Sequence, residues 1–246
     1  YERGPVIAIT TVINWDSAML SLFLASLLFF AIHALISGTR LRGVLVARLG
    51  EGVYMGLFSV VSAGALFWVI LSYGSAPQVE IWPDLKGLKH VSLSAMLLAS
   101  VLMVLAFTTP NPTAAGGEKS LARVQASGGI IKVTRHPFLV AVSLWSGCHI
   151  LANGDLASLI FFGGFLALSL IGPRQIDAKR ALKYPKDWSR FADQTSWLPF
   201  AAILQGRTKV TLAEIGWGRM AIGAVLYFLL FFLHGWAFGV VPHPFT

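Results

Sequence analysis

The hydrophobic residues of the chain gather in long runs, which polar, charged or Gly- and Pro-containing segments separate. A helix that crosses a bilayer needs about 20 predominantly apolar residues. Six runs approach or reach that length: Ala18–Ser37, Val53–Ser72, Val91–Phe107, about Phe138–Ala152 (beginning near Val133), Leu156–Gly172 and Ala221–Val241. The tight turn at Asn153-Gly154-Asp155 makes the fourth and fifth runs an antiparallel hairpin. The pattern predicts an all-α integral membrane protein, a bundle of six transmembrane helices.

Composition supports this class. Of the 246 residues, 56% are hydrophobic and 12% are charged, whereas an average soluble domain has about 25% charged residues. These values exclude a disordered chain, a coiled coil and an ordinary cytosolic enzyme. The single cysteine, Cys148, cannot form an intrachain disulfide, and we expect it to pack as a small hydrophobic residue.

The basic residues predict the orientation of the bundle. Of the 19 Lys and Arg residues, only Arg3, Lys86 and Lys89 fall on the side that holds both termini, and the other 16 fall on the opposite side. The positive-inside rule then places both termini outside and the basic loops in the cytoplasm. The net charge of +8 is thus explained by membrane lipids, without nucleic acid as a partner. We expect a bacterial inner membrane as the location.

One extramembrane segment, 173–218, interrupts what we predict to be a single transmembrane domain over residues 1–246. Within it, Asp177–Phe191 mixes charges with Tyr184, Trp188 and Phe191, and we expect a break near Pro185. This pattern fits a helix on the membrane surface. A solvated connector with interfacial aromatic residues is the alternative.

Histidines carry the candidate chemistry, because the apolar runs contain no carboxylate and no nucleotide-binding motif is present. His33, His149 and His234 lie inside runs. An ionisable residue in a membrane is costly to bury and indicates a functional site. Three histidines with few other ionisable groups favour a metal or haem, because imidazole is a typical haem ligand and a helical bundle can hold haem. Hydrogen bonds between helices are the alternative for each one.

Depth ranks the possible pairs of axial ligands. At a rise of about 1.5 Å per residue from the nearest cytoplasmic arginine, His33 lies about 10 Å deep. His149 and His234 lie about 21 and 22 Å deep by the same reckoning. Depth therefore favours pairing His149 with His234, and it places His33 closer to His136, at the cytoplasmic mouth of the fourth run.

Arg135 and His136 precede Pro137 at that mouth. Arg135 and His136 could hold haem propionates or an anionic lipid headgroup. Anchoring of the helix end by positive charge is the alternative.

Several motifs together resemble the NnrU family, which includes the 15-cis-ζ-carotene isomerases. The resemblance runs from about His33 to Val240 and rests on four stretches: Phe30–Arg42, Thr134–Asp155, Thr195–Arg207 and Leu233–Val240. It implies a multi-helix membrane protein and, for the isomerase branch, a haem b held by histidines. His33 and His149 are then axial-ligand candidates, and His136 and His234 are further family positions. His149 ranks highest, because the depth estimate and the resemblance both support it. The isomerase branch carries a cysteine three residues before the histidine at 149, where this chain has Ser146.

Three functional hypotheses remain from the sequence. The first is an accessory haem protein of denitrification or nitric oxide metabolism, as the resemblance to bacterial members implies. The second is an enzyme, a haem-dependent cis–trans isomerase of a lipophilic polyene. The third is a packing protein whose histidines only form hydrogen bonds. The sequence identifies neither a redox partner nor a substrate.

Overall fold

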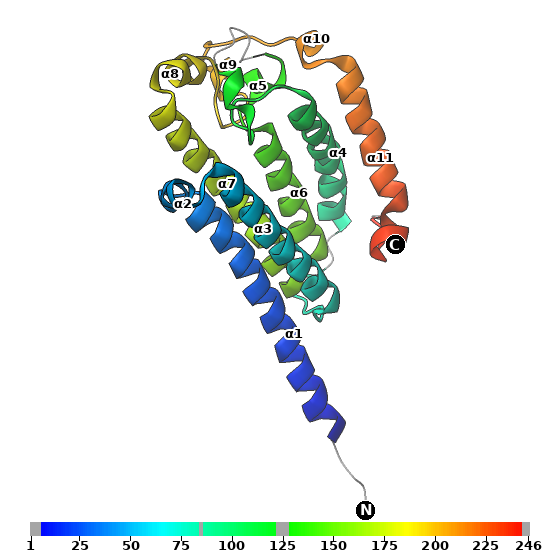
Figure 1. The fold of residues 1–246 in the computed structure, drawn as a ribbon. Coiled ribbons are helices and arrows are strands. Elements are labelled where there is room, and N and C mark those ends of the chain that lie inside the picture. The colour runs from blue at the N-terminus through cyan, green and yellow to red at the C-terminus, as the bar shows by residue number, and fades with distance from the viewer. Residues whose placement is uncertain (1–5, 84–85, 122–127, 243–246) are drawn as a thin grey trace, which may run out of the picture. The chain divides into compact units, whose positions relative to one another are not determined.

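The computed structural model describes residues 6–83, 86–121 and 128–242. Within these ranges the chain is helical and forms no strand; an isolated bridge pairs Glu80 with Asp155. The elements of Figure 1 are α1 (Val6–Ala31), η1 (Ile32–Ser37), α2 (Leu41–Leu49), α3 (Glu51–Ser75), α4 (Lys86–Thr108), η2 (Gly117–Ser120), α5 (Ile130–Val133), α6 (Pro137–Asn153), α7 (Leu156–Lys183), α8 (Pro185–Gln194), α9 (Ala201–Leu204), α10 (Leu212–Ile215) and α11 (Trp217–Phe238). The all-α prediction is confirmed.

Five segments of the described residues are long and apolar enough to cross a membrane. They are Ser17–Ser37, Glu51–Ser75, Gly87–Thr108, Leu156–Lys183 and Trp217–Phe238. The remaining predicted helix, α6, is apolar but has 17 residues, just below that length. The chain is therefore an integral membrane protein in which the count of six helices is approximate. The side of the membrane that each loop faces stays a prediction.

Two helix ends differ from the hydrophobic pattern. α6 begins at Pro137 rather than near Val133, because Thr134 is extended (φ −151°, ψ 135°). Proline is tolerated in the first turn of a helix, and it disfavours the helical conformation in the residue before it. α7 continues through Pro173 to Lys183, and α8 then starts at Pro185, so the predicted break there is confirmed.

The chain forms two compact units. Unit 1 comprises Tyr1–Asp84 and His149–Leu168, and unit 2 comprises Leu85–Cys148 and Ser169–Thr246. α6 and α7 each run without interruption from one unit into the other. The single domain over residues 1–246 stays a prediction.

In unit 1, α1 and α3 lie antiparallel and side by side (Figure 1). The hydroxyl oxygens of Ser21 and Ser72 are 2.8 Å apart, and Trp68 Nε1 donates to Ser21 Oγ at 3.0 Å. Further along, His33 contacts Phe58. Residue numbers therefore rise along one helix as they fall along the other, which is antiparallel packing. Hydroxyl contacts of this kind hold apolar helices together where the hydrophobic effect does not.

Unit 2 contains a hydrophobic core. The buried residues of this cluster come from α4, α5, α6, α8, α10 and the loop at Leu121. Trp188 and Phe191 of α8 belong to it and are 7% and 4% exposed. These two side chains therefore pack in the core, and the placement of segment 173–218 at the membrane surface stays a prediction. They form the buried face of α8, a helix that also carries charged residues. The sequence pattern of Asp177–Phe191 did not show what this face packs against.

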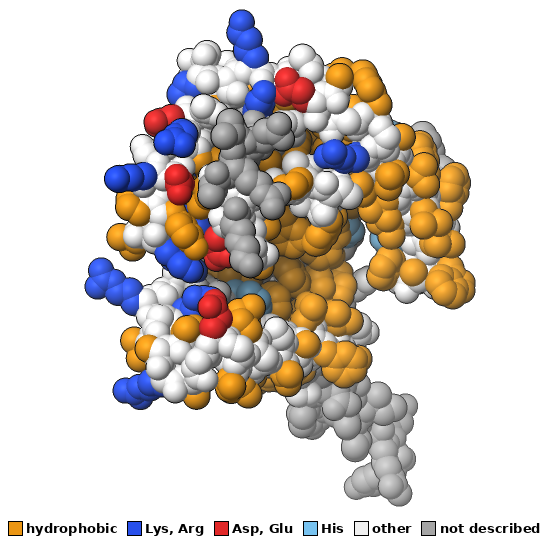
Figure 2. All heavy atoms as spheres, turned by 45° about the horizontal axis from the view of Figure 1, so that its top comes forward, with side chains coloured by type: hydrophobic (Ala, Val, Ile, Leu, Met, Phe, Trp, Pro, Cys, Tyr) orange, Lys and Arg blue, Asp and Glu red, His pale blue; other side chains and the backbone are white. Residues whose placement is uncertain are grey.

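The long helices expose large apolar side chains. Val60, Phe107 and Phe232 are 72–75% exposed, and hydrophobic side chains cover much of the helix surface visible in Figure 2. Exposed apolar surface of this extent is unusual in soluble monomers and matches contact with lipid.

Candidate functional site

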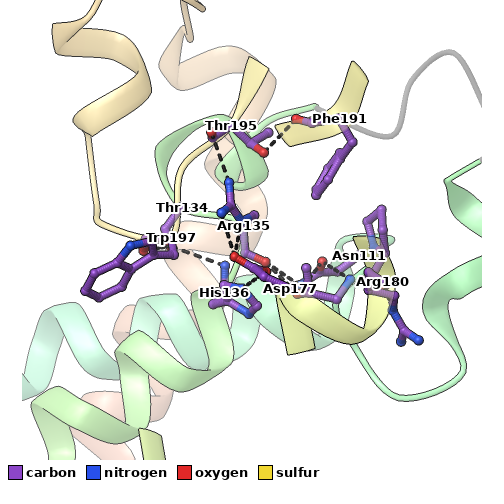
Figure 3. A network of polar contacts seen from close by, with 11 residues as sticks. Asn111, Thr134, Arg135, His136, Asp177, Arg180, Phe191, Thr195 and Trp197 are labelled. Atoms are coloured by element: carbon purple, nitrogen blue, oxygen red, sulfur yellow. Dashed lines mark hydrogen bonds and ion pairs between the residues drawn. The ribbon is translucent and has the colours of Figure 1, made fainter. Parts of the chain in front are cut away.

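A buried cluster of ionisable side chains in unit 2 consists of Arg135, His136 and Asp177 (Figure 3). Arg135 donates to Asp177 Oδ2 from Nε at 2.9 Å and from Nη2 at 2.5 Å. His136 Nε2 lies 2.8 Å from the other carboxylate oxygen, Oδ1. The side chains of Arg135, His136 and Asp177 are only 12%, 1% and 17% exposed. We call these three residues the Asp177 cluster.

Backbone contacts tie the Asp177 cluster to two loops. Arg135 donates from its backbone N–H to the Ser196 carbonyl at 2.9 Å and from Nη1 to the Thr195 carbonyl at 3.2 Å. Thr134 Oγ1 donates to the Trp197 carbonyl at 2.8 Å. On the other side, Thr113 Oγ1 donates to the Arg135 carbonyl at 2.6 Å. The Asp177 cluster therefore connects α7 with the loop after α8 and with the loop between α4 and η2 that carries Thr113.

A second ion pair lies nearby on α7. Arg180 Nη1 donates to Glu118 at 2.5 Å, while Nε and Nη2 donate to the carbonyls of Pro112 and Ala114. Partial burial opposes ionisation of Glu118, but the charge of Arg180 and its hydrogen bond outweigh it and hold the pKa of Glu118 below its usual value. Arg180 thus fixes the loop that carries Thr113.

His136 is neutral near pH 7. Burial lowers its pKa below the usual value, and this effect exceeds the opposing hydrogen bond and charge of Asp177. The contact with a carboxylate requires that Nε2 carry the proton and donate it. Both residues predicted at this mouth, Arg135 and His136, are therefore occupied with Asp177, which supports a structural role and leaves a role in haem binding a prediction.

His33 of unit 1 lies in η1, a π-helical segment that continues α1. Its Nδ1 lies 2.8 Å from the carbonyl oxygen of Phe29. A carbonyl only accepts hydrogen bonds, so Nδ1 carries the proton and the Nε2 lone pair stays outside this bond. A histidine that binds a metal is typically oriented by such a bond from its other nitrogen, and π-helical turns are frequent at functional sites.

Aromatic rings connect His33 with His149 inside unit 1. The His33 ring lies 4.3 Å from Phe29, which lies 5.2 Å from Phe165. Along α7, the ring centroids of Phe165 and Phe161 are 5.3 Å apart, and those of Phe161 and Phe162 are 4.8 Å apart. Phe162 stacks on His149 at 4.6 Å. The full series is His33, Phe29, Phe165, Phe161, Phe162, His149. Four phenylalanine rings thus stand between the two imidazoles in a continuous apolar series.

His234 of unit 2 lies near the end of α11. Its Nδ1 is 2.6 Å from the Val240 carbonyl oxygen, beyond the left-handed Gly239 that ends the helix. This bond also requires a proton on Nδ1. The contact ties down the helix end, and the predicted pairing of His149 with His234 stays a prediction.

Tyr54 and Arg42, which the sequence did not single out as site residues, are linked to His33 through Phe58. The Tyr54 ring stacks on Phe58 at 5.8 Å, and the Phe58 ring meets His33 edge-on at 5.4 Å. The guanidinium carbon of Arg42 lies 5.4 Å from the centroid of the Tyr54 ring. Among the described residues, the buried hydroxyls of Tyr54, Ser26 and Ser62 have no hydrogen-bond partner. An apolar run with a tyrosine gave no sign of this.

In the part of the chain that the structure describes, no group of three or more His, Cys, Asp or Glu residues could hold a metal ion. Haem needs one or two axial protein ligands, so this result does not bear on haem.

Comparison with known proteins gives a family match and two similar proteins. The family described as "NnrU protein" matches residues 21–242. The chain is 35% identical over 79 residues to the 15-cis-zeta-carotene isomerase, chloroplastic, of Arabidopsis thaliana, covering 32% of this chain and 22% of that protein. It is 24% identical over 201 residues to the protein of the same name from Zea mays, covering 79% of this chain and 53% of that one. At most, the chain spans about half the length of these relatives. No solved structure matches it.

Proposed function

The chain belongs to the NnrU family, and from this premise we propose that it binds haem b through His33 and isomerises a double bond of a lipophilic polyene. The hydrogen bond from His33 Nδ1 to the Phe29 carbonyl carries the proposal, because it orients an imidazole in an apolar site with its Nε2 lone pair available. The names of the two relatives favour 15-cis-ζ-carotene as the substrate class.

The residues around His33 fit a haem. Porphyrin is a large apolar ring, and Phe29 and Phe58 present aromatic rings to His33 at 4.3 and 5.4 Å. The buried Tyr54 hydroxyl, which has no partner, offers a hydrogen bond to a polar group of a ligand. His33 would hold the group, which would supply Lewis-acid chemistry at its iron. His149, at the far end of the ring series, is the second candidate ligand.

Haem iron, when bound, supplies a Lewis acid that can delocalise a conjugated chain and lower the barrier to rotation about a double bond. The chain's own contribution is binding and exclusion of water. Phe161, Phe162 and Phe165 form an apolar aromatic wall within contact distance of one another, and a flat polyene can stack on such rings. The Phe29 carbonyl accepts the Nδ1–H of His33 and orients the ring.

The test is isomerisation by the purified protein in liposomes. Reconstituted with haem, it should convert 15-cis-ζ-carotene to the 15-trans isomer, as separated by liquid chromatography. The His33→Ala variant should lose the activity, and His90→Gln, at an exposed position at the start of α4, should keep it. Equal conversion by wild type and His33→Ala, or by haem alone, would contradict the proposal.

A second candidate is an accessory haem protein that binds nitric oxide. Ser146 favours it, because the cysteine that the resemblance implies for isomerases is replaced by a buried serine whose hydroxyl has no partner among the described residues. This candidate predicts nitric oxide binding to the iron without conversion of the polyene.

A further inference from the structure

We propose that Tyr54 and Arg42 bind a carboxylate of the ligand at His33, which in the haem of the proposed function is a propionate. The inference rests on that function and adds what it leaves open, namely how the polar edge of an otherwise apolar ligand is held. Tyr54, near the start of α3, and Arg42, in α2, are both in unit 1.

The Tyr54 hydroxyl is the first observation. Its side chain is buried, with 4% of the residue exposed, and no described group accepts or donates a hydrogen bond to it. A buried hydroxyl without a partner is destabilising. The Tyr54 ring stacks on Phe58 at 5.8 Å, and the Phe58 ring contacts His33 at 5.4 Å. The proposal therefore places the polar edge of the ligand along this aromatic row, at its Tyr54 end.

Arg42 supplies the positive charge. Its guanidinium lies over the Tyr54 ring at 5.4 Å, and its Nη2 pairs with Glu51 at 3.1 Å. That pair is exposed, at 33% and 67% of the two side chains, and exposed pairs contribute little. Arg42 can therefore give up or share Glu51 when a second carboxylate arrives, and its planar donors suit that group.

The order of these residues along the helices matches an amphiphilic ligand. On α3, Tyr54 lies one turn closer to the helix start than Phe58. In the preceding part of the chain, Arg42 follows His33 by nine residues. His33, the proposed iron ligand, thus lies further from the α2–α3 turn, and the hydrogen-bond donors Tyr54 and Arg42 lie closer to it. Haem has the same polarity, with an apolar macrocycle and carboxylates on one edge. Arg135, which the sequence offered as one candidate for this task, donates to Asp177 and Thr195.

The experiment compares haemin with haemin dimethyl ester, in which both carboxylates are blocked. Each is titrated into detergent-purified apoprotein, and binding is followed by the Soret band. Wild type should bind haemin about tenfold or more tightly than the ester, the size expected for a hydrogen bond to a charged group. Tyr54→Phe and Arg42→Gln should each lose most of that preference while binding the ester as wild type does.

Two controls separate this effect from general ones. Arg48→Gln removes an equal charge from an exposed position of the same helix, and Tyr184→Phe removes a hydroxyl in unit 2. Both should keep the preference for haemin. Arg42 is partly exposed and in a short helix, so Arg42→Gln also tests the proposal if Tyr54→Phe fails to fold.

Each outcome decides one of the two proposals. If wild type binds haemin and Arg42→Gln keeps the preference, or if haemin and ester lose affinity equally, the carboxylate site is wrong and the haem proposal stands. If wild type binds neither porphyrin, the proposed haem function itself is wrong and the carboxylate site falls with it.

Discussion

Replacing Asp177 by asparagine removes the negative charge at the centre of the Asp177 cluster with little change in shape. Asp177 accepts two hydrogen bonds from Arg135 and one from His136. In Asp177→Asn the guanidinium stays buried without a counter-charge. The amide also presents an N–H group to at least one of the donors that the carboxylate had satisfied.

The expected cost follows from burial. The side chains of Arg135 and Asp177 are 12% and 17% exposed, so solvent screens the pair only slightly. Removing one member of a buried ion pair costs about 3–5 kcal/mol. For a chain of this length, each kcal/mol lowers Tm by roughly 2–4 °C. We therefore expect Tm to fall by about 6 °C or more.

Cys148 allows a direct assay, because it is the single cysteine and is 7% exposed. A maleimide dye that fluoresces on reaction reports its exposure during heating in detergent. Asp193→Asn, the same chemical change at an exposed position of α8, is the matched control. If Asp177→Asn melts within a degree or two of Asp193→Asn, the Asp177 cluster does not stabilise the fold and the reasoning is refuted.

Three further predictions concern stability. Because burial holds the pKa of folded His136 below its unfolded value, the unfolded state takes up the proton first, so stability falls as pH drops below about 6.5, by up to about 1.4 kcal/mol per pH unit. Between pH 7.5 and 5.5, Tm should fall less for His136→Gln than for wild type. An equal fall in Tm would contradict this. Asp155 accepts from the Ser158 backbone N–H at 2.9 Å at the start of α7, so Asp155→Ala should cost about 1–2 kcal/mol in denaturant titrations and Asp155→Ser much less. A Cβ on Gly223 would lie 2.5 Å from the Val101 Cα, so Gly223→Ala should lower Tm, whereas Gly164→Ala, with open space around it, should not.

The hydrophobic runs predicted most of the fold. Length and apolarity alone located the membrane helices, and Pro185 located the break before α8. The ends of α6 and α7 were less predictable, because hydrophobicity does not mark where a polar helix extension stops. α7 runs beyond its apolar part to Lys183, and this extension carries Asp177.

The candidate site was predictable only in part. His33 and His149 were candidates because a histidine in an apolar run is costly and their family positions agreed, and His149 ranked above His33 because depth also favoured it. The sequence could not show that His136 and Arg135 meet Asp177, since a partner 42 residues away becomes visible only when α7 packs beside the loop before α6. The role of Tyr54 could not be predicted either, because the hydroxyl of a buried tyrosine usually has a hydrogen-bond partner. Its missing partner is a property of the packed helices.

The absorption spectrum of the purified protein with added haem, oxidised and reduced by dithionite, tests the central claim most directly. Wild type and His90→Gln should give a Soret band with sharp reduced α and β bands, and His33→Ala should lose them or bind haem far more weakly. Recording His149→Ala beside them assigns the second axial ligand. A folded wild type that stays colourless, or a His33→Ala spectrum identical to that of wild type, would contradict haem ligation by His33.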